Sequence, residues 1–241
     1  MLEVKIDSKR FGVSVDEYPE VIRGLHFNCA TDSFTSIVGP SGCRKTTALK
    51  CILGLDTDYT GLITVDGKTD GSRKMSAVFQ EPRLLPWRTV EQNVRLALEQ
   101  PDDNKLDTLF EELGLTEHRN FYPTALSLGL ARRAGLARAL ALEPSILVLD
   151  EPFVSLDDET AGRLRKLLAS VWSARSCTAL MVTHNLLEAI ELSDRILFFS
   201  ASPSTIIGSY DIPIPRAQRD LEKVMQVRAD ILAQGLHAGA D

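Results

Sequence analysis

The chain of 241 residues has few cysteines, and none is arranged for metal binding or for a disulfide framework. The four cysteines form no CxxC pair and no Cys/His cluster, which argues against structural zinc and favours free thiols in a reducing compartment. No apolar run reaches the roughly 18–20 residues that a bilayer span needs. The first residues, MLEVKIDSKRF, contain no apolar signal-peptide core. Any role at a membrane is therefore expected to depend on a partner that crosses it.

Basic residues are in deficit as well. Lys and Arg total 27 against 33 Asp and Glu, which leaves a net charge of −6 without a long basic run. This balance disfavours direct nucleic-acid binding and gives no electrostatic reason to adhere to anionic lipid. The 44% hydrophobic and 25% charged residues are ordinary for a globular protein, and the length allows one large or two-lobed domain.

Strand and helix patterns alternate along much of the chain, which predicts an α/β fold with a largely parallel sheet. A block of helical spacing at 83–143 interrupts the alternation and is a candidate second lobe; the core is assigned to 1–82 and 144–210, with a C-terminal extension at 211–241. Predicted strands are 33–38, 62–68, 76–79, 146–149, 178–182 and 195–199. Predicted helices run from the loop after 38 to about 53, and over 90–98, 106–113, 127–142, 157–172, 185–192 and 221–232.

The segment Gly39–Thr46, GPSGCRKT, follows the first predicted strand and matches the phosphate-loop pattern GxxxxGK[ST] except at Arg44. In such a loop, backbone N–H groups and a helix N-terminus surround the β-phosphate. Lys45 would neutralise the β and γ oxygens, and the Thr46 hydroxyl would bind Mg²⁺. A Gly/Ser turn with a surface lysine is the alternative interpretation of this segment alone.

Three further polar positions follow predicted strands. The buried run ILVL ends in Asp150 and Glu151, Gln80 follows VF, and His184 follows ALMVT. The carboxyl ends of parallel strands face the ligand crevice, so Asp150 could hold Mg²⁺ and Glu151 could polarise an attacking water. Gln80 could touch Mg²⁺ and that water, and His184 could contact the γ-phosphate. Taken singly, each could instead be a solvated strand end or a structural side chain.

These pieces, in this order, resemble the ABC transporter ATPase family over essentially the whole chain. The matching strings are GPSGC-KTT, VFQEPRLLPWRTVEQNV, LS-G…ARAL, ILVLDEPFVSLD and VTHNLLEAIELSDRI. The LLPW string resembles the importer branch for nitrate, sulfonate, taurine and related small solutes. The resemblance implies a P-loop ATPase core with an inserted helical lobe that carries the signature motif.

The resemblance assigns a role to each matching position. Glu151, His184 and Gln80 would be catalytic; Thr46, Gln80 and Asp150 would bind Mg²⁺; Asp157 would be the D-loop aspartate. Phe11 would stack on adenine, with Tyr18 as its rival. ATP would be bound by the following residues of the phosphate and signature loops: Gly39, Ser41, Gly42, Cys43, Arg44, Lys45, Thr46, Thr47, Ser127 and Gly129.

The resemblance also implies partners. They are a second ATPase subunit, identical or not, which forms a head-to-tail dimer; transmembrane permease subunits; and a periplasmic or extracellular solute-binding protein. No nucleic acid is expected, and the place is the cytoplasmic face of the cell membrane. Trp87 could line the groove for the permease or could be a core aromatic.

Two departures bear on the activity. Arg44 stands in place of the family's second phosphate-loop glycine, and Leu128 in place of the first signature glycine. The Cβ of Arg44 is expected to crowd the β-phosphate, and the bulk of Leu128 to hinder dimer closure. The alternative to a working ATPase is therefore a catalytically impaired structural subunit. A soluble ABC protein of DNA repair or translation is disfavoured, because such chains carry two modules or a coiled-coil insertion.

Overall fold

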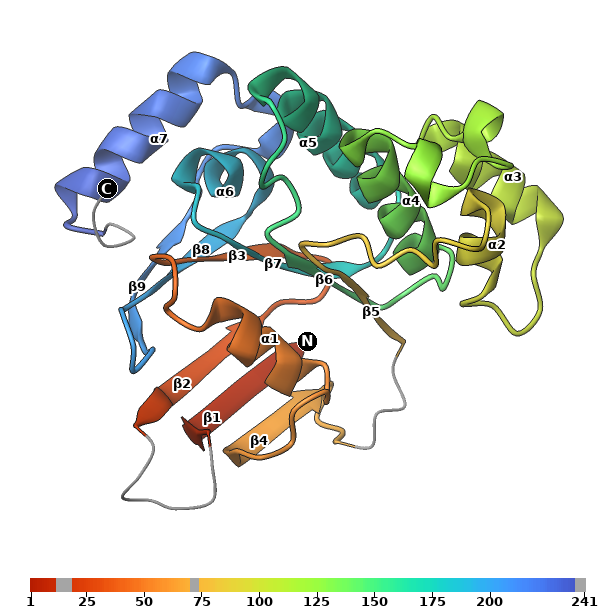
Figure 1. Cartoon of the computed structure of the whole chain (residues 1–241). Helices are drawn as coiled ribbons and strands as arrows, with labels where there is room; N and C mark the ends of the chain where they lie inside the picture. Colours follow the sequence, from red (N-terminus) through yellow and green to blue (C-terminus); the bar gives the residue numbers. More distant parts are fainter. Residues whose placement is uncertain (12–18, 70–73, 237–241) are drawn as a thin grey trace. The chain divides into compact units, whose positions relative to one another are not determined.

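A computed structural model describes residues 1–11, 19–69 and 74–236 (Figure 1). The chain divides into two compact units. The first combines Met1–Ser72 with Thr178–Asp241, and the second is Arg73–Cys177. Within the described residues, no helix is both long enough and apolar enough to cross a membrane.

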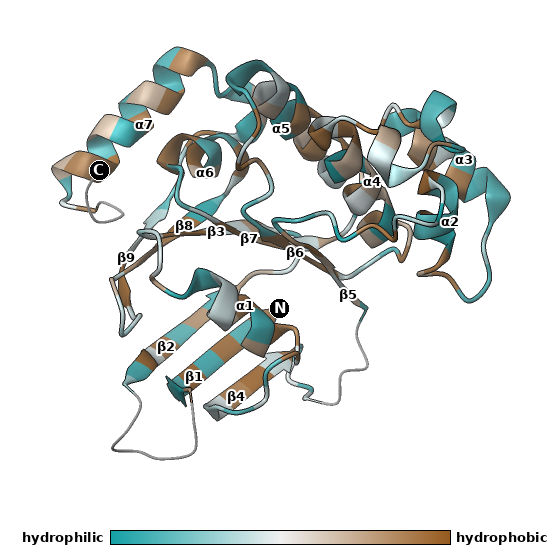
Figure 2. Ribbon diagram, in the orientation of Figure 1, coloured by the Kyte–Doolittle hydropathy of each residue, from teal (hydrophilic) through white to brown (hydrophobic). Residues whose placement is uncertain are grey.

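The first unit begins with an antiparallel three-stranded sheet in the order β2-β1-β4. Its strands are β1 (Leu2–Arg10), β2 (Glu20–Cys29) and β4 (Thr60–Val65). Teal and brown bands alternate along β1 and β2 in Figure 2, because every second side chain of a strand faces the core. No strand is predicted before residue 33, although Leu2, Val4 and Ile6 are buried at the spacing of a strand.

A second sheet in this unit carries parallel strands buried on both faces. Its strands lie in the order β7-β3-β8-β9: β7 (Thr178–Thr183), β3 (Phe34–Val38), β8 (Arg195–Phe199) and β9 (Ile206–Asp211). The first three are parallel, and β9 runs antiparallel along β8. Every residue of β3 and β7 is buried, including the serine and threonines. Strand β9 was not predicted.

The described residues of the first unit form the helices α1 (Lys45–Ile52), α6 (Leu186–Leu192) and α7 (Leu221–Ala233). A short 3₁₀ turn, η3, covers Arg216–Gln218. The apolar faces of α6 and α7 pack with β3 and β8 in one cluster that includes Val38, Ile190, Phe198, Val227 and Ile231. This core includes Val38, the last residue of β3, where the phosphate loop begins.

The second unit holds two parallel strands, β5 (Met75–Val78) and β6 (Ile146–Asp150), and most of the helices of the chain. The helices are α2 (Val90–Arg95), α3 (Asp103–Glu112), α4 (Leu128–Leu140) and α5 (Asp158–Ser173), with 3₁₀ turns η1 (Thr116–His118) and η2 (Pro123–Ala125). The block expected to be a helical lobe, 83–143, lies inside this unit, which also contains β5, β6 and α5.

The predicted α/β class is confirmed, and the predicted helices are present with shifted ends. A cap accounts for the early start of α3. Asp102 accepts from the N–H groups of Asn104 and Lys105, so α3 starts ahead of its first buried leucine. Thr89 and Gln92 form a reciprocal capping box that starts α2.

Candidate functional site

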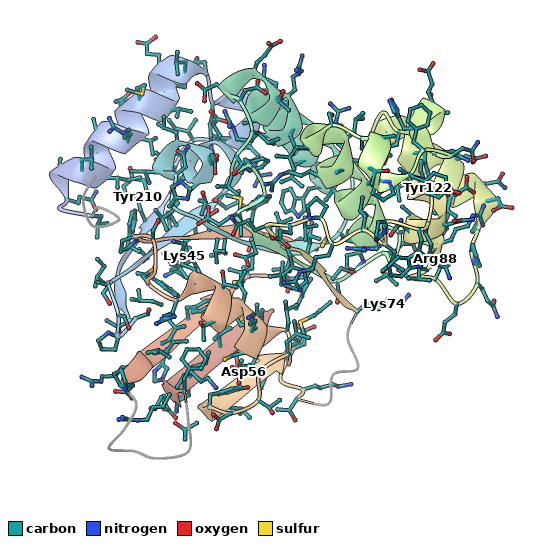
Figure 3. The ribbon with its side chains drawn as sticks, viewed as in Figure 1. Lys45, Asp56, Lys74, Arg88, Tyr122 and Tyr210 are labelled. Carbon is teal, nitrogen blue, oxygen red and sulfur yellow. The ribbon has the colours of Figure 1, made fainter. Side chains whose placement is uncertain are left out.

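The phosphate loop runs from the end of β3 to the start of α1, and Lys45 ties it together from inside. The Lys45 ammonium, labelled in Figure 3, donates to the carbonyl oxygens of Gly39 at 2.7 Å and Pro40 at 3.1 Å. Lys45 is only 7% exposed, and Gly42 has a φ of 80°, in the region that favours glycine. A buried ammonium beside a helix N-terminus suits the phosphates of a nucleotide, which fits the predicted role of this loop.

Arg44 caps the N-terminus of α1 in a left-handed conformation, with φ of 67° and ψ of 27°. A glycine takes this conformation without strain, whereas a residue with a Cβ is destabilised by about 1–2 kcal/mol. The left-handed backbone at position 44 is therefore a second reason for the family's glycine there, besides the close approach of the backbone to phosphate. The crowding expected of the Arg44 Cβ stays a prediction.

The Arg44 side chain is directed to Phe11. The guanidinium carbon lies 5.7 Å from the centroid of the Phe11 ring, and the Lys9 ammonium lies 5.3 Å from the same centroid. Phe11 is 41% exposed. It remains the candidate for stacking on adenine, while its rival Tyr18 lies outside the described residues.

His184 and the phosphate loop leave the same edge of the sheet. Val38, the last residue of β3, pairs with Thr183, the last residue of β7, so Gly39 and His184 both follow paired strand ends. His184 is exposed there. Asn185 caps α6 by accepting from the N–H groups of Leu187 and Glu188, a role that asparagine fills as well as aspartate.

The second unit brings Gln80 and the acidic strand end together in the same way. Val78 at the end of β5 pairs with Leu149 of β6, so Gln80 and Glu151 follow the two strands at one edge. Asp150 is 4% exposed, and Glu151 has a φ of 48°. A glutamate in this left-handed region is strained, which is common where a site requires one backbone geometry.

Arg132 of α4 holds the loop after Glu151 in place. It is 5% exposed. Its Nη1 atom donates to the carbonyl oxygens of Glu151 at 3.2 Å and Pro152 at 2.7 Å, and its Nη2 atom donates to that of Val154 at 2.6 Å. Arg132 is not among the predicted site residues, because one arginine in a helical run of arginines and alanines carries no signal of its contacts.

The signature turn begins α4. Ser127 is the N-cap, and its Oγ accepts from the N–H of Leu130 at 3.3 Å. A Cβ on Gly129 would lie 3.0 Å from Thr160 Cγ2, so a larger residue here would require the Thr160 side chain to shift by a few tenths of an ångström. Asp157 caps α5 by accepting from the N–H of Thr160 at 2.9 Å, and that hydrogen bond holds the pKa of its carboxyl below the usual range.

Trp87 is 69% exposed, so the interpretation of Trp87 as a core aromatic is wrong. The segment that carries it is held by the buried Asn93, whose Oδ1 accepts from the N–H of Leu85 at 2.7 Å. The Nδ2 of Asn93 donates to the carbonyl oxygens of Leu85, Arg88 and Thr89. Asn93 was also missed, since its role depends on a loop that only the fold reveals.

A lysine-centred phosphate loop between a buried parallel strand and a helix defines a P-loop nucleotide-binding domain of the α/β class. The family profile described as ABC transporter matches residues 22–154. The aliphatic sulfonates import ATP-binding protein SsuB of Bacillus anthracis is 37% identical over 227 residues, covering 91% of this chain and 90% of that protein. SsuB 1 of Xanthomonas axonopodis pv. citri (strain 306) is 36% identical over 98% of this chain and 96% of its own.

Solved structures show the same fold. A dimeric, post-hydrolysis ATP-binding cassette bound to ADP and Pi superposes with a TM-score of 0.76 at 25% identity, covering 89% of this chain and 100% of the other. The chain therefore belongs to the ABC transporter family, as an ATP-binding domain. Such domains are ATPases coupled to transport, and this chain is one of them.

Proposed function

We propose that this chain is the ATP-hydrolysing subunit of an importer for a small solute of the sulfonate class. The observation that carries the proposal is identity of 36–37% along nine-tenths or more of the chain with proteins named for aliphatic sulfonate import. The LLPW string after Gln80 supports the same branch. Membership of the family makes the chain an ATPase coupled to transport, and we propose in addition the import direction and the solute class.

The proposed nucleotide site follows from the chemistry of its side chains. Lys45 and the backbone N–H groups at the start of α1 would bind the β- and γ-phosphates, with Phe11 below the adenine. Gly39, Ser41, Gly42, Cys43, Arg44, Thr46 and Thr47 complete the phosphate loop, and Ser127 and Gly129 would close on the γ-phosphate of a second subunit.

Mg²⁺ would arrive with the nucleotide and would neutralise the charge on its phosphate oxygens. Thr46, Gln80 and Asp150 are its proposed protein ligands, because hydroxyl, amide and carboxylate oxygens are the hard donors that it prefers. Among the described residues, no group of three or more His, Cys, Asp or Glu side chains could hold a metal.

In the proposed reaction, Glu151 accepts a proton from the attacking water while Gln80 and His184 orient the water and the γ-phosphate. The strained backbone of Glu151, held by Arg132, supports this role because it fixes where the carboxylate starts. Asp157 would sit at the interface between the two ATPase subunits.

The proposed partners are a second ATPase subunit, transmembrane permease subunits and an extracytoplasmic solute-binding protein, with the chain at the cytoplasmic face of the membrane. Exposure of Trp87 on a segment fixed by Asn93 supports a permease contact there. An impaired structural subunit is the second candidate. It is favoured by Arg44, strained in the phosphate loop, and by Leu128, 41% exposed at the signature turn.

Deletion of the gene in its native host tests the import function. We expect growth on an alkanesulfonate as the only sulfur source to be lost, and growth on sulfate to be kept. The wild-type chain should restore growth, while Lys45→Ala should not. Undiminished uptake of labelled alkanesulfonate in the deletion strain would contradict the proposal, and a defect confined to nitrate or another solute would redirect it within the same branch.

A further inference from the structure

The exposed cation that faces Phe11 comes from the phosphate loop itself. Arg44 starts in that loop, at the N-cap of α1, and its guanidinium carbon ends 5.7 Å from the centroid of the Phe11 ring. One side chain therefore joins the place proposed for the phosphates to the place proposed for the base. The replacement of glycine by arginine adds this contact, since glycine has no side chain to make it.

The second cation beside the ring is committed elsewhere. Lys9 is 2% exposed, and its ammonium donates to Asp56 Oδ1 at 2.8 Å, to the Asp58 carbonyl oxygen at 2.6 Å and to Asp58 Oδ2 at 3.3 Å. Asp56 is labelled in Figure 3. Two carboxylates pair with the Lys9 ammonium, and burial fixes its position. Lys9 is thus a support beside the ring and does not move away when a ligand approaches.

Arg44 differs from Lys9 in both respects. It is exposed, and no ion pair to its guanidinium is found among residues 1–11, 19–69 and 74–236. Within this part of the chain, the guanidinium is therefore held by its cation–π contact with Phe11. An exposed cation–π contact changes an equilibrium by about two- to fivefold, whereas stacking of a base on an aromatic ring is worth about five- to 150-fold.

We propose that Arg44 is a built-in competitor of the nucleotide base for the face of Phe11. In the nucleotide-free chain the guanidinium lies over the ring, and a base that stacks there displaces it into solvent. The base prevails because its stacking is stronger, but the affinity for nucleotide is about two- to fivefold lower than with an unoccupied ring. This inference rests on the proposed nucleotide site, in which Phe11 receives the base.

Two ligands separate the base from the phosphates: ADP, which has both, and pyrophosphate, which has only the phosphates. Neither is hydrolysed by the ATPase reaction, so calorimetric titration in the presence of Mg²⁺ gives true dissociation constants. The ratio of the pyrophosphate constant to the ADP constant reports the base alone. Loss of a positive charge near the phosphates changes both constants and cancels in the ratio.

Arg44→Met removes the charge and keeps a side chain of similar reach. We expect the ratio to rise about two- to fivefold in Arg44→Met and in Arg44→Gly. In a Phe11→Leu background, the same substitutions should leave the ratio unchanged. Lys50→Met, which removes an exposed cation near the other end of α1, is the matched control and should not change the ratio in either background.

Three results would overturn the inference. If the ratio stays constant in Arg44→Met, the base does not meet the guanidinium. If both ligands bind more weakly and the ratio falls, Arg44 is a ligand of the nucleotide. If the ratio rises equally without the Phe11 ring, Arg44 acts by crowding rather than through Phe11. Lys45→Ala keeps the proposed function separately testable: wild-type binding of ADP that survives this change would contradict the nucleotide site, whatever Arg44 does.

Discussion

The phosphate loop and the signature turn each carry a larger residue in place of a family glycine, and the two replacements differ in kind. Arg44 holds a left-handed backbone with φ of 67°, so it is strained where it stands. Leu128 is the first residue of α4 and is not among the non-glycine residues with positive φ in the described chain. The replacement at Arg44 strains the backbone, whereas the replacement at Leu128 only adds side-chain volume at the surface. The effect of replacing a family glycine therefore depends on the backbone conformation at its position.

We expect the largest effect on ATP turnover from a change at Glu151, directly after β6. The effects of Arg44 and Leu128 on turnover can be compared only in a chain that hydrolyses ATP. Glu151→Gln removes the proposed general base and keeps the size of the side chain. We expect ATP binding to be retained and turnover to fall by roughly 10²-fold or more. Binding is measured by titration and turnover by phosphate release. Turnover within a fewfold of the wild type would remove Glu151 from the mechanism.

A change at Arg132 tests whether α4 also sets the backbone geometry of the loop after Glu151. Arg132→Met leaves the carbonyl oxygens of Glu151, Pro152 and Val154 without these donors, and we expect stability to fall by about 1–3 kcal/mol. Turnover should fall with it. Arg133→Met is the matched control, since the hydrogen bond that Arg133 donates to the Leu113 carbonyl oxygen is long, at 3.4 Å. Equal urea midpoints for the two variants would speak against this role.

Reversion of both replacements sharpens the comparison at the level of activity. Arg44→Gly should act on nucleotide affinity and Leu128→Gly on closure of the ATPase dimer, so their effects on turnover at limiting ATP should multiply. We expect about threefold from each and about tenfold from the double variant, equivalent to about 1.4 kcal/mol. Steady-state kinetics over a range of ATP concentrations separates the two steps. Wild-type turnover of roughly 1 s⁻¹ or above, unchanged by the double reversion, would contradict the claim that Arg44 and Leu128 impair turnover.

The smallest expected effect is on stability, and it distinguishes the replacements at Arg44 and Leu128 most directly. Arg44→Gly relieves left-handed strain but makes the unfolded chain more flexible, so we expect a net gain in stability of about 0.5 kcal/mol. Leu128→Gly relieves no strain and places glycine in a helix, so we expect a loss of up to about 1 kcal/mol. Urea unfolding of the two variants should therefore shift in opposite directions. A shift of the same sign would break the comparison.

The order of motifs was sufficient to predict the family, while the roles of the candidate site residues stay predictions. The register of β3 with β7 then placed His184 at the edge of the phosphate loop, as the parallel-strand argument expected. Strands β1 and β2 were missed, although their alternation was present in the sequence. Arg132 and Asn93 could not have been predicted, since each acts through backbone N–H or carbonyl groups that carry no sequence signal.

Asn93 has a consequence for recognition. Four hydrogen bonds from one buried amide fix the turn at Leu85, Arg88 and Thr89, and so hold the exposed Trp87 on a segment that lacks regular secondary structure. A partner that covers Trp87 does not have to order the loop first. The conformational entropy of that loop was already lost on folding, so more of the indole's burial contributes to binding. Rigidity in an irregular segment thus favours affinity as well as shape.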